Sequence, residues 1–378
     1  MKSESGSSPN ANTPLDWSLV QRVLLIRLRS IGDTVLMTPC LAALKAWRPN
    51  LEITVVSEPL AAPLLENHPL VDDLIVAEGS ILSRAALISK LRKARFGAAF
   101  NMHGGPTGAL LARLAGSTQS VGYQGQALSW LLSRRAPPPD VILGRSRIHS
   151  VEQQLALLNW TGVPRIESRP QLSLHVNPEI EQRVRTKLES LGGQSWKQIL
   201  WRGFGCIVPG AAFESKRWNA EGFACAADHL RERWNLPCVI VAGPGQEELA
   251  RQVASKTLAQ TPVVDGLSLK ELVALLAMTA VFVGNDSGPM HIAAALDRPI
   301  IAVWGSSDQS VWHPWTEAPW RIVSSKSTNA HHDLSEPNGG IKSIGIDKVI
   351  AAVDEVLELA LEANHAADQK QGGQGRWN

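Results

Sequence analysis

Asp286, Ser287, Gly288 and Pro289 stand together in the stretch "FVGNDSGPMHIAAAL", which begins at residue 282. The run before them predicts a buried parallel strand, and "MHIAAAL" predicts a short buried helix whose first turn suits Pro289. The N-terminus of such a helix carries free N–H groups and the positive end of the helix dipole, so it is a site for a diphosphate. Asp286 would repel phosphates and is better matched to the hydroxyl groups of a ribose or sugar. His291 has two interpretations, a phosphate donor or a buried histidine bonded to backbone.

A second loop, "VPGAAFESKRW" at residues 208–218, combines small residues with cations. Gly210, Ala211 and Ala212 are small enough for their backbone N–H groups to face a ligand. Lys216 and Arg217 follow before the next expected helix, and small residues with a cation suit a phosphate. The alternative is that both cations lie on a solvated surface, where long basic side chains are common.

A third loop, "RLRSIGDTVLMTP" at residues 27–39, brings one carboxylate to the start of a helix. The preceding strand should end near Arg29, and Gly32 permits a tight turn before Asp33. Ligands of an open α/β sheet bind at the carboxyl ends of the strands, which is where this loop begins. Asp33 is therefore a candidate functional carboxylate, and the structural alternative is an N-cap of the helix.

Several motifs of other function classes are absent from the sequence. No strand is followed by G-x-G-x-x-G, because "GPGQEE" at residues 243–248 has only two glycines, and no G-x-x-x-x-G-K-[ST] occurs. There is no H-E-x-x-H and no D-x-D, so a metal ion has no compact ligand motif. The four cysteines form no C-x-x-C pair, which favours reduced, mostly buried thiols over a zinc site: Cys40, Cys206, Cys225 and Cys238.

The elements that must position these loops alternate between Val/Ile-rich runs and helix-length segments, which is typical of βαβ units and parallel sheets. In the first half the expected strands are at residues 22–28, 52–57, 73–77 and 97–102. In the second half they are at residues 206–210, 237–243, 261–265, 280–285 and 299–305. Two doubly wound α/β domains are predicted.

The domain boundaries follow from prolines and composition. Prolines interrupt the segment before residue 178, so we expect one domain over residues 19–177, a second over 178–346 and a last helix over 347–363. Residues 1–18 and 364–378 are expected to be disordered tails, because they lack the apolar residues that offset ordering entropy. No apolar run reaches the length of a membrane span and the head lacks a signal-peptide pattern, so we expect a soluble, cytoplasmic protein.

Together and in this order, the three loops resemble glycosyltransferase family 9, the family of the ADP-heptose:lipopolysaccharide heptosyltransferases. The matching segments are "SIGDTVLMTP", "PGA…SKRW" and "NDSGPMHIAAALDRPIIAVWG", and the likeness covers nearly all of residues 20–360. It implies a GT-B fold, in which two Rossmann-like domains face each other across a cleft. It further implies an inverting transfer of heptose, or a related sugar, from a nucleotide-diphosphate donor to a lipopolysaccharide core-type acceptor. The implied mechanism needs no metal or cofactor, in agreement with the missing D-x-D.

Carried over by position, the resemblance assigns roles to single residues. Asp33 would be the general base, and Lys216 would offset the charge that grows on the departing diphosphate. Asp286 would bind hydroxyls of the donor. The remaining implied donor-binding residues are Gly210, Ala211, Ala212, Glu247, Ser287, Gly288, Pro289, Met290 and His291.

The sequence departs from the family pattern at two places. Ala211 and Ala212 replace residues with hydroxyl or acidic side chains, so only backbone N–H groups remain there for the donor. The segment before the last helix has no cysteine cluster, so we infer no metal and regard His331 and His332 as loop residues.

The chain has a net charge of +2, but its basic residues are unevenly distributed. Between Arg84 and Arg147 Lys and Arg far outnumber the acids, and such asymmetry steers anionic partners. The resemblance makes the partners a nucleotide-sugar, ADP-heptose in the first instance, and an anionic lipopolysaccharide-type acceptor, with peripheral contact to the inner membrane surface and no nucleic acid. The alternative for these basic residues is an ordinary solvated surface.

Two other functions are compatible with parts of this pattern. A non-catalytic sugar-nucleotide or glycan binding protein would share the fold and bind nucleotide without forming product. A nicotinamide-dependent oxidoreductase is permitted by the βα repeats but disfavoured by the missing G-x-G-x-x-G.

Overall fold

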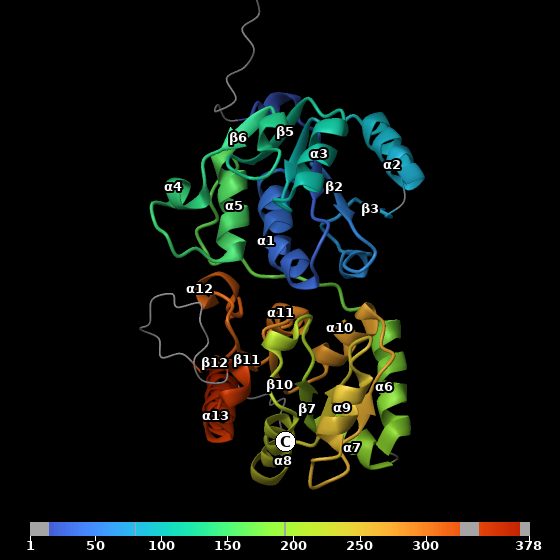
Figure 1. Cartoon of the computed structure of the whole chain (residues 1–378), viewed down its shortest axis with the longest axis vertical. Helices are drawn as coiled ribbons and strands as arrows, with labels where there is room; N and C mark the ends of the chain where they lie inside the picture. The colour runs from blue at the N-terminus through green and yellow to red at the C-terminus, as the bar shows by residue number, and fades with distance from the viewer. Residues whose placement is uncertain (1–14, 80, 193, 326–339, 371–378) are drawn as a thin grey trace, which may run out of the picture. The chain divides into compact units, whose positions relative to one another are not determined.

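The computed structural model describes residues 15–79, 81–192, 194–325 and 340–370, and it divides into two compact units (Figure 1). The division falls between Gln171 and Leu172, six residues before the boundary that the prolines indicate. Residues 172–177 precede α6 (Pro178–Gly192), which packs with the helices of the second unit.

The first unit is built on a parallel sheet with the strand order β3-β2-β1-β4-β5-β6. The strands are β1 (Arg22–Ile26), β2 (Glu52–Ser57), β3 (Asp73–Val76), β4 (Ala98–Asn101), β5 (Gln119–Tyr123) and β6 (Arg134–Ala136). Leu24 of β1 pairs with Thr54 on one side and Ala99 on the other. This is the order of a dinucleotide-binding doubly wound sheet, whose chain path reverses between the first and fourth strands.

Helices cover both faces of the first sheet. The α-helices are α1 (Ile31–Trp47), α2 (Ile81–Lys93), α3 (Pro106–Leu114), α4 (Pro139–Leu143) and α5 (Ser150–Trp160), and the 3-10 helices are η1 (Trp17–Leu19), η2 (Ala62–Leu64) and η3 (Ser129–Leu131). Val23 and Leu25 of β1 pack with α1 and α5, whereas Leu24 and Ile26 pack with α2 and α3. After the exposed Arg22 at its start, the strand is apolar because both of its faces are buried.

The second unit repeats this architecture, with the strand order β12-β11-β10-β7-β8-β9 in a parallel sheet. The strands are β7 (Gly205–Val208), β8 (Cys238–Val241), β9 (Val263–Val264), β10 (Val281–Asn285), β11 (Ile300–Trp304) and β12 (Trp320–Ser324). Counted from β7, the order is again 3-2-1-4-5-6, read from the other edge, and the reversal lies between β7 and β10.

The helices of the second unit are also on both faces. They are α6, α7 (Gln194–Arg202), α8 (Ala220–Trp234), α9 (Glu247–Ala254), α10 (Leu269–Ala277), α11 (Gly288–Ala295), α12 (Gln309–Trp312) and α13 (Ile346–Lys370), with 3-10 helices η4 (Glu214–Lys216) and η5 (Gly340–Ser343). Val281 and Val283 of β10 share a core with α8, α9 and α13. The last helix, α13, packs against the core of the second unit through one face, which carries Val349, Val353 and Val356.

The doubly wound α/β class expected from the sequence is confirmed in both units. The expected strand segments each contain a strand, but β5, β6 and β12 were not predicted, because "QSVGY", "RRA" and "WRIVS" contain polar or charged residues and lack the continuous apolar run of a central strand. α13 runs to Lys370, beyond the expected end at residue 363, on a polar extension. In the described part of the chain, no helix combines the length and apolar character needed to cross a membrane.

Candidate functional site

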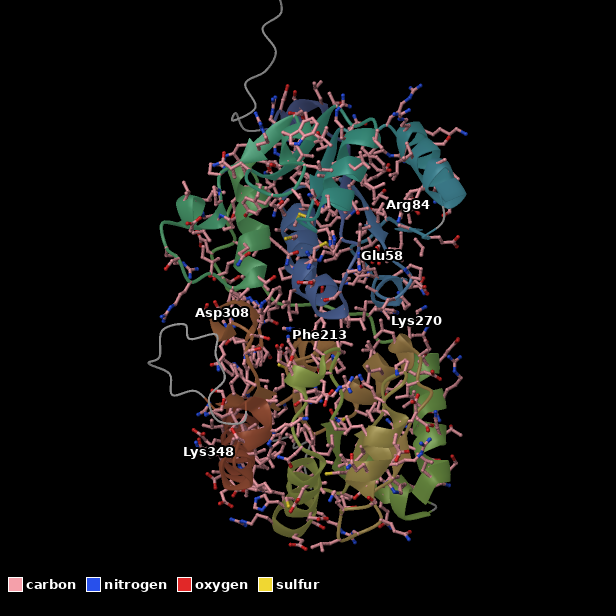
Figure 2. The ribbon with its side chains drawn as sticks, in the orientation of Figure 1. Glu58, Arg84, Phe213, Lys270, Asp308 and Lys348 are labelled. Carbon is pink, nitrogen blue, oxygen red and sulfur yellow. The ribbon has the colours of Figure 1, made fainter. Side chains whose placement is uncertain are left out.

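The reversal of chain path in the second unit brings two of the sequence-predicted loops together. β7 and β10 are neighbouring parallel strands, so the loop after β7 (residues 209–219) and the turn after β10 (residues 286–287) leave the same edge of the sheet. Ligands of doubly wound sheets bind at the carboxyl ends of the strands beside such a reversal. Figure 2 labels Phe213, an exposed residue of the loop after β7.

Lys216 and Asp286, which the sequence assigns to different parts of a donor, form one ion pair. Nζ of Lys216 lies 2.6 Å from Oδ2 of Asp286. The Asp286 side chain is 6% exposed and that of Lys216 is 28% exposed. A carboxylate this buried depends on its cation, while the ammonium remains within reach of solvent and of an incoming anion.

The small residues of the same loop lie close to the side chains of Gln246 and Arg217. A Cβ atom on Gly210 would come within 1.7 Å of Oε1 of Gln246, so a side chain there would displace the end of the Gln246 side chain. The Ala211 carbonyl accepts hydrogen bonds from Nε2 of Gln246 and Nε of Arg217, both at 3.0 Å. Ala211 is buried and Ala212 is exposed. The loop is therefore held by its carbonyl groups.

The turn after β10 leads into α11, with Ser287 at the N-cap position. In the described structure Oγ of Ser287 makes no capping bond to α11 and instead donates to the Asn285 carbonyl at 3.1 Å. Gly288 and Pro289 form the first turn, half-buried. The first N–H groups of α11 are thus left without a side-chain cap, which suits an anion.

Met290 and His291 do not extend this opening with their side chains. Both are buried, Met290 at 0% and His291 at 4% exposure, and the Met290 N–H donates to the Ser287 carbonyl at 3.2 Å. His291 is thus buried, as its second interpretation, a buried histidine bonded to backbone, requires. Met290 packs in the core.

Glu247 lies at the first position of α9, in the loop region after β8. Its Oε1 accepts the Gly245 N–H at 3.1 Å. Hydrogen bonds from backbone N–H groups, its own first and then that of Gly245, lower the pKa of Glu247. A carboxylate in this position stabilises the N-terminus of its own helix.

In the first unit, Asp33 occupies the third position of α1 and not the N-cap. Ser30 is the N-cap, and the two residues form a capping box in which Oδ2 of Asp33 accepts from the N–H and Oγ of Ser30 at 3.3 and 3.1 Å. Asp33 does take part in capping the helix, as the structural alternative expected, but the N-cap residue itself is Ser30. The other oxygen, Oδ1, lies 2.5 Å from Nη2 of Arg27.

Arg27, which the sequence analysis did not select, anchors Asp33 to the end of β1. Its side chain is 8% exposed, and its Nη1 donates to the Met102 carbonyl after β4 at 2.5 Å. Burial lowers the pKa of Arg27, and the adjacent Asp33 carboxylate offsets part of that effect. The signal in the sequence is a cation inside the apolar run "VLLIRL", because a buried cation requires a partner.

His103 is the second residue near Asp33 that sequence reasoning missed. It follows β4, the neighbour of β1 at the reversal of the first sheet. Burial is the largest cause of its lowered pKa, and the charge of Arg27 acts in the same direction, while Asp33 and a backbone hydrogen bond at Arg29 oppose it. The imidazole of His103 therefore loses its proton more readily than that of an ordinary histidine.

Metal-ligating side chains do not gather in the part of the chain that the structure describes. These residues contain no cluster of three or more His, Cys, Asp or Glu side chains suited to a metal. Cys40, Cys206 and Cys238 are buried thiols, and burial raises the pKa of Cys238 to about 12. His331 and His332 lie outside the described residues.

The basic residues of the first unit are not a uniform surface. Arg84, on α2 and labelled in Figure 2, is exposed, as are Lys90, Arg92, Lys93, Arg95, Arg113, Arg145 and Arg147. Arg134 is buried, whereas Arg135 is half-buried. An anionic partner can therefore reach the exposed cations on and near α2, but not the buried Arg134.

Three comparisons describe what the chain is similar to. The family model described as glycosyltransferase family 9 (heptosyltransferase) matches residues 84–339. The chain is 27% identical to lipopolysaccharide heptosyltransferase 3 of Escherichia coli over 352 residues, which covers 87% of this chain and 97% of the relative.

Two solved structures share the fold. A family 9 glycosyltransferase from Veillonella parvula superposes with a TM-score of 0.76 at 22% identity and covers 92% of this chain and 99% of that one. The ADP-heptose lps heptosyltransferase II of E. coli gives a TM-score of 0.73 at 24% identity, with coverages of 89% and 99%. These likenesses confirm the GT-B class expected from the sequence.

Proposed function

The chain belongs to glycosyltransferase family 9, and on that basis we propose that it is an inverting, metal-independent enzyme that transfers heptose from ADP-heptose to a lipopolysaccharide core-type acceptor. The coarse activity, heptose transfer in lipopolysaccharide synthesis, follows from the family and its curated relatives. The donor nucleotide, the stereochemistry and the independence from metal are the finer parts of the proposal.

One observation carries the donor site: Lys216, Asp286 and the uncapped start of α11 converge at the reversal of the second sheet. The ammonium group and the free N–H groups offer positive charge to a diphosphate without a metal ion. Asp286 supplies a carboxylate for the hydroxyl groups of the sugar or ribose. The likeness to the ADP-heptose lps heptosyltransferase II of E. coli supports ADP as the nucleotide.

In the proposed reaction, a hydroxyl oxygen of the acceptor attacks the anomeric carbon as the bond from that carbon to the diphosphate oxygen breaks. The hydroxyl proton passes to Asp33, and the electron pair of the broken bond leaves with the nucleoside diphosphate. Attack on the face opposite the departing diphosphate inverts the anomeric configuration. Lys216 and the N–H groups of α11 would stabilise the charge that grows on the leaving group.

Asp33 would serve as base while it remains in its capping box. Arg27 contacts Oδ1 of the carboxylate, and Ser30 contacts Oδ2. Each carboxylate oxygen has two lone pairs, so Oδ1 keeps one lone pair for the acceptor hydroxyl. These contacts fix the orientation of the carboxylate, which is what a general base requires.

The acceptor and the location of the enzyme are proposed from charge. The exposed cations on and near α2 complement an anionic lipid-linked acceptor and the anionic inner surface of the cytoplasmic membrane. We place the enzyme in the cytoplasm, with peripheral contact to that surface.

The experiment is calorimetric titration of the purified protein with ADP, UDP, GDP, CDP and dTDP without metal, followed by a transfer assay with ADP-heptose. Preferential binding of ADP and formation of product support the proposal. A preference for another nucleotide changes the donor and keeps the class of enzyme. Nucleotide binding with no transfer to any core-type acceptor would instead support a non-catalytic binding protein.

A further inference from the structure

Asn285, the last residue of β10, holds the loop after β7 at both of its ends. Its side chain is fully buried. Its Oδ1 accepts the N–H of Trp218 at 3.1 Å, and its Nδ2 donates to the carbonyl of Pro209 at 2.8 Å. The side-chain amide of Asn285 therefore holds both ends of the loop of residues 209–218.

An asparagine is the side chain of this length that can make both bonds. Aspartate has no donor for the Pro209 carbonyl, leucine has neither donor nor acceptor, and glutamine is one methylene longer. Buried polar groups that lose their partner are costly, so the two contacts depend on each other.

The far end of the loop is further fixed by the Trp218 ring. Its Nε1 donates to the Ile344 carbonyl at 3.0 Å, and the ring lies so close to Gly222 that a Cβ there would be 2.3 Å from it. Lys216 is only two residues before this anchor. The position of its ammonium group is thus set by a loop whose ends are closed by Asn285 and Trp218.

We propose that Asn285 is a positioning residue of the donor site, which presents Lys216 and the backbone of residues 210–212 to the diphosphate without touching it. The inference rests on the proposed function for the nature of the ligand. The closure of the loop by Asn285 can be tested separately, because it exists in the protein without ligand.

The first measurement is amide hydrogen exchange of ligand-free wild type and Asn285→Leu, which fills the space but makes neither bond. We expect faster exchange within residues 209–218, including the Trp218 N–H. Asn285→Asp, which keeps the acceptor for Trp218, should give a smaller increase there and serves if the leucine variant does not fold. Unchanged exchange of this loop in the variants would overturn the proposal.

Thr279→Val is the matched control. Thr279 is also buried, stands just before β10, and loses one hydrogen bond, from Oγ1 to the Leu276 carbonyl. It should lower the melting temperature without faster exchange in residues 209–218. If the control loosens this loop as much as Asn285→Leu does, the effect is general destabilisation and the assignment to Asn285 is wrong.

The second measurement is ADP affinity in a double-mutant cycle with Lys216→Ala. Asn285→Leu should weaken ADP binding by about tenfold, the equivalent of one or two modest hydrogen bonds. If Asn285 acts through Lys216, the effects of the two substitutions will be less than additive. Additive effects, or wild-type ADP affinity in Asn285→Leu, contradict the inference. A wild-type protein that binds no nucleotide contradicts the proposed function, and the exchange data still decide whether Asn285 closes the loop.

Discussion

Nζ of Lys216 lies 2.6 Å from Oδ2 of Asp286, and this contact links the loop after β7 to the turn after β10. The pair joins the two segments that any donor at the reversal of the second sheet would contact. A diphosphate would compete with the Asp286 carboxylate for the ammonium group. The strength of the pair therefore enters the affinity for every nucleotide that binds there.

The competition predicts the effect of Asp286→Asn. Removal of the carboxylate charge frees Lys216 for the diphosphate, so the affinity for ADP should rise by about fivefold. ADP lacks the transferred sugar and offers Asp286 only the hydroxyl groups of its ribose. Transfer from a nucleotide-sugar should fall, because a hydroxyl contact is weakened. Calorimetry with ADP and a transfer assay separate the two effects; weaker ADP binding would show that Asp286 supports the nucleotide itself.

Asp33→Asn tests the proposed base. Turnover should fall by at least about a hundredfold, because an amide accepts no proton, while ADP binding in the second unit should be unchanged. Glu271→Gln is the matched control, because Glu271 forms the same capping box with Ser268 at the start of α10. Both variants weaken a helix start, and only the first should lose turnover. Full activity of Asp33→Asn would exclude the base assignment.

The buried pair of Arg27 and Asp33 predicts a large effect on stability. Arg27→Met leaves the half-buried carboxylate without its cation and the Met102 carbonyl without its donor, so the free energy of unfolding should fall by about 3 kcal/mol. The double variant Arg27→Met with Asp33→Asn should lose less than the sum of the single changes. Urea unfolding measures both quantities. Additive losses would indicate that the pair contributes no coupling.

Asp354 predicts a change of stability in acid. Burial alone would raise its pKa, but hydrogen bonds from His229 and Trp234 of α8 outweigh burial, and the pKa is lowered. A carboxyl with a lowered folded-state pKa stabilises the protein above its unfolded pKa of about 3.9, and this contribution is lost as the pH falls through the folded value. Asp354→Asn should therefore be less stable than wild type at pH 6, and the difference should shrink below pH 4. Chemical unfolding at several pH values measures the difference; a constant gap would show that the charge of Asp354 is not responsible.

The sequence predicted the fold better than the contacts of the site. The sequence predicts Val/Ile-rich strands such as β2 and β10 because both faces of a central parallel strand are buried. It does not predict strand β6, because the arginines of β6 break the apolar pattern at the edge of the sheet. Spacing placed Lys216 and Asp286 in separate loops, and only the strand order shows that the loops are neighbours.

Other site residues were missed because their roles depend on burial. The sequence shows Arg27 as a cation inside an apolar run, but only the structure shows that its partners are Asp33 and the Met102 carbonyl. Asn285 stands next to Asp286 in the same motif, yet its two partners are 67 and 76 residues away in the chain. No local pattern reports contacts of that sequence separation.

The turn at Ser287 also has a thermodynamic consequence. Because Oγ of Ser287 bonds the Asn285 carbonyl, the described structure leaves the start of α11 without a side-chain cap. Any solute anion that occupies this end adds its binding free energy to that of the folded state, and none to the unfolded chain. The melting temperature of the second unit therefore reports ligand binding. A phosphate-rich buffer should raise the melting temperature modestly, and the nucleotide that the site recognises should raise it at far lower concentration.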